Sequence, residues 1–281
     1  MQRLVAGIMM LVFASCTWAQ QPAREDALDN LGWKLGCQAW TFKALSLMET
    51  LDTLKKLDIH YLEIYPGQRF SQGNSAKTDH NMTDAMIAIL KAKLTETNVT
   101  AMSYGVVNLT NSEAQDRKVF EFAKQLGLTT IVSEPPENAI EMLDRLCLEY
   151  RINLAIHDHP SPNHYWNPDT VLKVCTGRSD RVGACADVGH WRRSGLVPVE
   201  CLKKLEGRII ELHFKDINEN KEDVPWGQGT VDIAACMAEI KRQKIKPLFS
   251  IEYERTSGEE LIANVTKSIR YFKEEATKLA K

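Results

Sequence analysis

The chain lacks an excess of charge of either sign. Its 35 lysine and arginine residues and 37 aspartate and glutamate residues are mixed along its length, and the formal net charge is -2. A protein that follows a nucleic-acid backbone needs a basic stripe or patch. This balance therefore argues against a nucleic-acid partner.

Long apolar runs are missing after residue 19. No later stretch approaches the roughly 20 apolar residues that a helix needs to cross a bilayer. The sequence therefore predicts no transmembrane segment in the mature chain.

The first 19 residues have the pattern of a signal peptide. Arg3 is followed by apolar or small residues from Leu4 to Ser15, and Thr17-Trp18-Ala19 places small residues at both recognition positions for cleavage before Gln20. The alternative is a buried first helix. The residues before Cys16 also loosely match a bacterial lipobox, which would leave a lipid anchor on Cys16. We expect an exported, periplasmic protein with a polar leader at residues 20–31.

Cysteine pairs with the spacing of a zinc site are absent as well. Six cysteines remain after residue 19, and an even number in an oxidising compartment permits disulfides. Cys37 and Cys185 fall in strand-like runs, whereas Cys147 and Cys236 fall in helical patterns. We expect buried free thiols.

Short apolar runs alternate with amphipathic stretches from residue 32 onward. Runs of this kind separated by helices indicate a parallel sheet covered on both faces, and eight of them indicate a closed (β/α)8 TIM barrel over residues 32–281. An open doubly wound sheet is the alternative, but no glycine-rich nucleotide-binding turn follows the first run. The expected strands are 35–41, 61–65, 99–104, 129–133, 153–157, 182–186, 209–214 and 248–252.

Polar side chains gather where the expected strands end. In a barrel these ends share one face, which carries the active site. Burying so many carboxylates and imidazoles is costly unless they are paired, and a bound cation would compensate them. The residues concerned are Glu63, Glu134, His157, Asp158, His159, Asp187, His190, His213, Lys215, Asp216, Glu252 and Glu254.

Three motifs carry a resemblance to a known family. They are Asp187-Val188-Gly189-His190, Leu212-His213-Phe214-Lys215-Asp216 and Ile251-Glu252-Tyr253, with Pro225-Trp226-Gly227-Gln228-Gly229 as a further match to a Gly-x-Gly loop. With these motifs the chain resembles the xylose-isomerase-like barrels, which include sugar isomerases and epimerases and, more distantly, endonuclease IV.

The resemblance implies one divalent metal, with Mn, Co, Zn and Mg all open. Asp187, His213 and Glu252 match three of the family's ligands. The fourth, a carboxylate on the fifth strand, is replaced by His157. Either His157 itself or Glu134 from the neighbouring strand completes the set.

The leading hypothesis is an isomerase or epimerase that removes a proton next to a sugar carbonyl. Glu134 or Glu252 would take the proton, and His159, His190 or Lys215 would return it or steer the oxygens. Export makes a non-phosphorylated carbohydrate the expected substrate. The main alternative is a lyase or hydratase that acts on 3-keto-glycosides through the same enediolate.

Two other functions are open but weaker. A phosphodiesterase like endonuclease IV would need several metals and a cationic DNA-binding face. A non-catalytic carbohydrate-binding protein would be expected to have lost its metal ligands, whereas three of four are present here.

Overall fold

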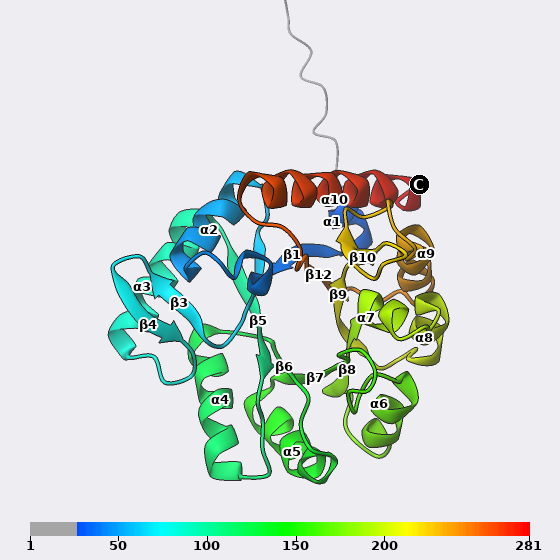
Figure 1. Cartoon of the computed structure of the whole chain (residues 1–281). Helices are drawn as coiled ribbons and strands as arrows, with labels where there is room; N and C mark the ends of the chain where they lie inside the picture. Colours follow the sequence, from blue (N-terminus) through cyan, green and yellow to red (C-terminus); the bar gives the residue numbers. More distant parts are fainter. Residues whose placement is uncertain (1–26) are drawn as a thin grey trace, which may run out of the picture.

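The computed structural model describes residues 27–281, in which eight parallel strands close into a barrel surrounded by helices (Figure 1). Each strand pairs with the next barrel strand along the chain, and the last pairs with the first. The TIM barrel predicted from the sequence is confirmed. Its strands are β1 (Lys34–Gln38), β2 (Tyr61–Ile64), β5 (Thr100–Val107), β6 (Thr130–Ser133), β7 (Asn153–His157), β8 (Val182–Asp187), β9 (Ile209–Phe214) and β12 (Leu248–Ile251).

Helices form the outer layer, and their ends are marked by ordinary capping chemistry. Ser46 and Glu49 form a capping box at the start of α2, and α4 ends at Gly127, whose φ of 74° suits a residue without a Cβ. The helices are α1 (Ala27–Leu31), α2 (Leu47–Lys56), α3 (Asp84–Thr97), α4 (Glu113–Leu126), α5 (Ile140–Tyr150), α6 (Pro168–Cys175), α7 (Val188–Arg193), α8 (Pro198–Lys204), α9 (Ile233–Gln243) and α10 (Gly258–Leu279), with the 3-10 helices η1 (Ala39–Phe42) and η2 (Glu137–Ala139).

The first strand is shorter than the sequence predicts. β1 ends at Gln38, whereas the apolar run continues to residue 41. The Gln38 side chain accepts a hydrogen bond from the Trp40 amide at 3.0 Å and caps η1. This local bond turns the chain out of the strand and brings Trp40 to the carboxyl end of the barrel.

Both long loops that follow strand ends contain a small hairpin. The loop after β2 holds β3 (Gln68–Ser71) and β4 (Asn74–Thr78), and the loop after β9 holds β10 (Asp216–Ile217) and β11 (Asp223–Val224). Both loops therefore contain regular secondary structure at the carboxyl end of the barrel.

The six cysteines of the described chain are buried free thiols, as expected. Residues 27–31, assigned to the polar leader from the sequence, form α1, whose apolar side chains pack against the core beside α10 (Figure 1). The signal peptide, Cys16 and residues 20–26 lie outside the described residues.

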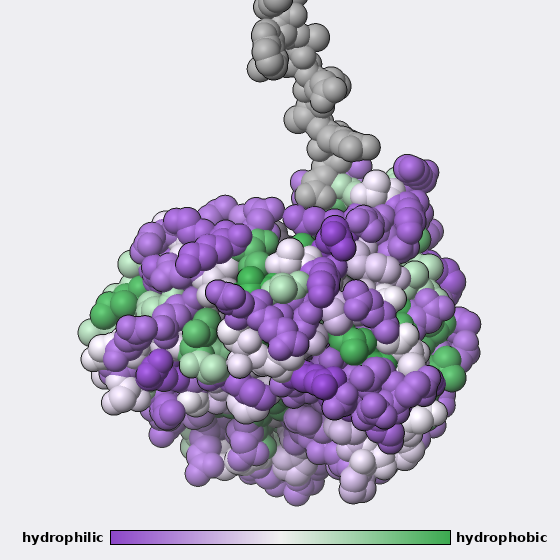
Figure 2. All heavy atoms as spheres, turned by 45° about the horizontal axis from the view of Figure 1, so that its top comes forward, coloured by the Kyte–Doolittle hydropathy of each residue, from purple (hydrophilic) through white to green (hydrophobic). Residues whose placement is uncertain are grey.

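The face of the molecule seen in Figure 2 is mainly hydrophilic. On the face in Figure 2, hydrophobic residues form small separate patches among hydrophilic ones. Within residues 27–281, no helix has the length and apolarity required to span a membrane.

Candidate metal centre

Four strand ends bring together the residues of the expected metal site. His157 ends β7, Asp187 ends β8, and His213 lies in register with Asp187 on β9. Glu252 follows β12, and its amide donates to Phe214 O at 3.2 Å. All four side chains are buried, with at most 7% exposure. The sequence pattern therefore identified residues that meet in space.

The four side chains form a compact donor set. Their ligand atoms lie within 4.8 Å of one another. One buried atom of each has no hydrogen-bond partner: His157 Nε2, Asp187 Oδ2, His213 Nδ1 and Glu252 Oε2. His213 Nδ1 lies 3.0 Å from Glu252 Oε2, but this ion pair lacks hydrogen-bond geometry. Because buried polar atoms are nearly always hydrogen-bonded, four neighbouring atoms without such a bond require an explanation. Two imidazole nitrogens and two carboxylate oxygens are suitable ligands for a divalent transition metal.

Each imidazole is held by a carboxylate outside this set. His157 Nδ1 donates to Glu134 Oε1 at 3.1 Å, and His213 Nε2 donates to Glu63 Oε2. The other ring nitrogen of each histidine lies toward a carboxylate of the donor set: His157 Nε2 is 3.7 Å from Asp187 Oδ2, and His213 Nδ1 is 3.0 Å from Glu252 Oε2. Carboxylates commonly orient metal-binding histidines in this way.

Glu134 lies outside the four-residue donor set and belongs to a second group of possible ligands. It groups with His157 and His159, and it also accepts hydrogen bonds from the His159 amide and ring. Of the two candidates for the fourth ligand, His157 is the one that joins Asp187, His213 and Glu252. Burial alone would raise the pKa of Glu134, but the two histidines lower it.

Lys215 lies beside the donor set as a buried cation. Its ammonium is 3.0 Å from Asp187 Oδ2 and 2.9 Å from Glu252 Oε2, as ion pairs without hydrogen-bond geometry. Burial would lower the pKa of Lys215, but the Asp187 and Glu252 carboxylates raise it. The lysine remains charged and partly offsets the negative charge of the two carboxylates.

His190 is neutral and does not join the four donors. Burial holds the pKa of His190 well below its ordinary value. The Asp187 carboxylate acts to raise this pKa, and the Lys215 ammonium acts to lower it. Arg193 Nη1 lies 3.1 Å from His190 Nδ1 and forms an ion pair with Glu254, and Arg193 Nη2 forms one with Asp223. The basic residues near the centre are therefore already paired with acids.

The sequence reasoning noted Glu63 at a strand end without giving it a role, and it missed Glu211. Both are buried inside the barrel, where Ser103 donates to Glu211 Oε1 at 2.7 Å. Side chains alternate along a strand, so Glu211 and His213 share one face of β9, and Lys215 directly after the strand continues the alternation. That alternation is the signal that identifies Glu211 as an inward-facing carboxylate.

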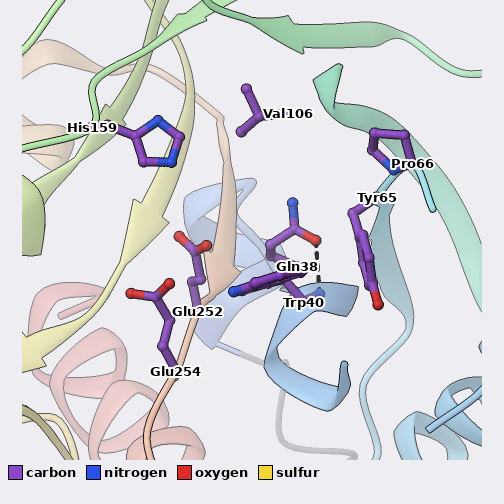
Figure 3. Close-up of a pocket in the computed structure, with 8 residues that line it drawn as sticks. All are labelled: Gln38, Trp40, Tyr65, Pro66, Val106, His159, Glu252 and Glu254. Atoms are coloured by element: carbon purple, nitrogen blue, oxygen red, sulfur yellow. Dashed lines mark hydrogen bonds between the residues drawn. The ribbon is translucent and has the colours of Figure 1, made fainter. Parts of the chain in front are cut away.

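A cavity of about 270 Å³ opens beside the donor set. Figure 3 shows Trp40 and Tyr65 on one side and His159, Glu252 and Glu254 on the other. The two aromatic rings contact edge to face, with centroids 5.1 Å apart. Among the expected catalytic residues, Glu252 and His159 line this cavity, whereas Glu134, His190 and Lys215 do not.

Two features that the sequence singled out are structural. The Asp216 carboxylate accepts hydrogen bonds from the amides of Ile217, Gly227, Gly229 and Val231, which fixes the Gly-x-Gly loop. Asp158 Oδ1 accepts from the Asp187 amide at 2.8 Å and thereby holds the end of β8. His164 pairs with Glu137 and does not line the cavity.

Comparison with known proteins identifies the family. The model of the xylose isomerase-like TIM barrel matches residues 51–275. No curated protein matches the chain. A solved structure of an uncharacterized protein from Parabacteroides distasonis is 32% identical, with a TM-score of 0.72, and the match covers 86% of this chain and 99% of that one.

More distant structures share the fold. A D-tagatose 3-epimerase-like protein is 18% identical, with a TM-score of 0.67 and coverage of 86% of this chain and 96% of that one. IOLI protein, solved with a bound zinc, is 17% identical, with a TM-score of 0.65 and coverage of 87% and 98%. The chain belongs to the xylose isomerase-like TIM barrel family.

Proposed function

We propose that the protein is a divalent-metal-dependent enzyme that isomerises or epimerises a non-phosphorylated carbohydrate by removing a proton next to its carbonyl. The observation that carries this proposal is the donor set at the edge of the cavity: four buried atoms without hydrogen-bond partners on His157, Asp187, His213 and Glu252. When bound there, a divalent cation would polarise the substrate carbonyl and stabilise the negative charge that develops on its oxygen.

Glu252 is the proposed base, because it belongs to the donor set and also lines the cavity. Burial would raise its pKa, but Lys215 and His213 lower it and keep the carboxylate ionised. An ionised carboxylate beside the carbon-bound proton can accept it once the carbonyl is polarised.

His159 is the proposed partner that returns or donates a proton. It is exposed in the cavity, and its ring hydrogen-bonds Glu134. Glu134 is then a positioning residue for both His157 and His159. Trp40 and Tyr65 provide an apolar wall against which the C–H groups on one face of a sugar ring can pack (Figure 3).

The lining of the cavity supports a neutral substrate. Among the described residues that line it, none is lysine or arginine. Arg193 and Lys215 lie close by but are engaged with Asp223, Glu254, Asp187 and Glu252. A phosphate would find no free cationic partner in this cavity. Export to the periplasm, proposed from residues 1–19, is consistent with this substrate class.

A second activity is favoured by one specific observation. At the β7 position of His157, the epimerases that the sequence resembles carry a carboxylate. Of the two carboxylates in the donor set here, Asp187 and Glu252, only Glu252 lines the cavity. With His159 as a proton donor, this arrangement suits loss of a leaving group after proton removal. The second candidate is therefore a lyase or hydratase acting on 3-keto-glycosides.

The test follows proton exchange and product formation by NMR in deuterium oxide. Protein stripped with a chelator and then reloaded with Mn, Co, Zn or Mg is incubated with ketohexoses and, separately, with a 3-keto-glucoside. Metal-dependent deuterium incorporation into an epimer or isomer supports the first activity, and release of the aglycone supports the second. Absence of both exchange and release with every metal contradicts the proposal.

A further inference from the structure

A second and larger cavity adjoins the first. It has a volume of about 680 Å³ and shares Pro66 and Val106 with the cavity beside the donor set. Small-molecule sites usually span about 300–1,000 Å³. The first cavity, at about 270 Å³, falls just below this range and suits one sugar ring. The second offers space for a further group on the side away from Glu252.

The walls of this second cavity come from three segments at the carboxyl end of the barrel. They are the two ends of the β3–β4 hairpin loop, the end of β5 with the residues that follow it, and the first turns of α4. Its lining is rich in groups that exchange hydrogen bonds with hydroxyls, including Asn108, Gln115 and Asp116. Asn108 and Gln115 are exposed, and within the described chain their side-chain amides have no hydrogen-bond partner.

Asp116 supplies an independent observation. It is only 1% exposed, and its Oδ1 accepts hydrogen bonds from the Thr110 amide at 2.9 Å and the Thr110 hydroxyl at 3.2 Å. Its Oδ2 is buried and has no partner among the described residues. A buried carboxylate oxygen left in this way requires a donor, and a sugar hydroxyl in the cavity can provide one.

The charge of the lining favours hydroxyls over an anionic group. Asp79 and Asp116 contribute two carboxylates against the single ammonium of Lys118. Planar amides and carboxylates beside Pro66 give the mixed polar and apolar surface that a sugar ring requires.

We propose that this cavity, which we call the distal subsite, binds a second sugar residue, so that the substrate is a disaccharide or a larger glycoside and not a free monosaccharide. This inference rests on the proposed function, because the reacting ring must occupy the cavity beside Glu252. The distal subsite holds the part of the substrate that carries no reacting carbon.

The experiment compares matched pairs of substrates. One pair is fructose and a disaccharide whose reducing residue is fructose, and the other is 3-keto-glucose and 3-keto-maltose. Deuterium exchange or product release gives kcat/KM for each. We expect the disaccharide to exceed its monosaccharide by about tenfold or more, in line with several added hydrogen bonds. Equal kcat/KM within a pair that reacts would overturn the distal subsite while leaving the proposed function intact.

Variants locate the effect. Asn108→Ala and Gln115→Ala should each lower kcat/KM for the disaccharide about 3- to 10-fold, the usual result of losing one hydrogen bond, and leave the monosaccharide unchanged. Asn111→Ala is the matched control, because Asn111 is an exposed amide on the same loop that does not line the cavity. A loss shared by both substrates, or by the control, would contradict the assignment.

Direct binding decides the case in which no substrate of the panel reacts. That result would count against the proposed function, whereas calorimetry with 3-keto-maltose measures binding without turnover, and the variants separate the contribution of the distal subsite. Binding to the wild type that is weakened by Asn108→Ala and not by Asn111→Ala supports the subsite. No binding, or binding that Asn108→Ala leaves unchanged, overturns it.

Discussion

At the scale of single residues, the donor set depends on side chains that lie outside it. Glu134 holds His157 and His159, and Glu63 holds His213. Each bond fixes which ring nitrogen faces the cluster. These carboxylates are proposed to orient the histidines and not to bind the metal themselves. A substitution that removes only their charge, followed by measurement of metal affinity, tests this role.

Replacing Glu134 by Gln should weaken metal binding without removing a ligand. The amide has the size of the carboxylate but lacks its charge, so His157 is less firmly oriented and less basic. Substitution of such an orienting group usually reduces metal affinity about 10- to 100-fold. Titration of chelator-treated protein with Zn or Mn by calorimetry gives the dissociation constant.

The matched control is Glu137→Gln, three residues further along the chain, where the carboxylate pairs with Lys173 and His164 instead. This variant should bind metal as the wild type does. An unchanged dissociation constant for Glu134→Gln would show that Glu134 does not orient the site.

Gly189 of the Asp187-Val188-Gly189-His190 motif makes room for Lys215. A Cβ at this position would lie 2.0 Å from Lys215 Cγ and 2.7 Å from Cδ. Alanine normally stabilises a helix relative to glycine by about 1 kcal/mol. At Gly189 we expect the reverse, a loss of about 1–3 kcal/mol in the free energy of unfolding, because the buried lysine stem must move.

Chemical denaturation measures this loss, and activity should fall with it because the Lys215 ammonium leaves Asp187 and Glu252. Gly73→Ala is the control, since a Cβ there meets no atom within 4 Å and its φ is not positive. A Gly189→Ala protein as stable as the wild type would refute the packing argument.

At the scale of elements, the barrel was predictable from the sequence because each parallel strand is buried on both faces and reads as a continuous apolar run. The run 153–157 coincides with β7, and 209–214 coincides with β9. The turn into η1 was not predictable, because a single hydrogen bond from the Trp40 amide to Gln38 ends the strand inside an apolar run.

The proximity of three candidate ligands was predictable for a related reason. Asp187, His213 and Glu252 lie at the carboxyl ends of three successive barrel strands, and these ends must meet. The choice between Glu134 and His157 depended on side-chain direction across two strands, which spacing along the chain does not give. The distal subsite is lined by residues of α4 and of the β3–β4 loop, which are separated in sequence, so no local sequence pattern predicts it.

The loop after β9 is held by one carboxylate, and its removal should have a large effect. Asp216 is fully buried and accepts hydrogen bonds from four backbone amides. Asp216→Ala leaves these amides without that acceptor, and each unsatisfied buried group costs about 1–3 kcal/mol. We expect a loss of more than about 3 kcal/mol in unfolding free energy, measured by urea denaturation.

Asp232→Ala provides the comparison within the same segment. The Asp232 carboxylate caps α9 through one amide, that of Ala235, so its removal should cost about 1 kcal/mol. Similar losses for the two variants would mean that Asp216 does not organise the loop.

At the scale of the whole molecule, charge and cavity lining together restrict the substrate. Basic residues near the donor set are paired with acids, and none of the described residues lining the first cavity is cationic. We expect kcat/KM for fructose to equal or exceed that for fructose 6-phosphate. A preference of about tenfold or more for the phosphate would show that this restriction is wrong.

A divalent cation at His157, Asp187, His213 and Glu252 is central to the proposed function, and metal content tests its presence most directly. Elemental analysis of dialysed protein, after incubation with Zn or Mn, should give about one equivalent per chain for the wild type. Asp187→Ala, shown to be folded by circular dichroism, should retain far less, because a mononuclear site that loses one of its four ligands binds weakly. Equal metal content in the two proteins, or none in the wild type, would contradict the account.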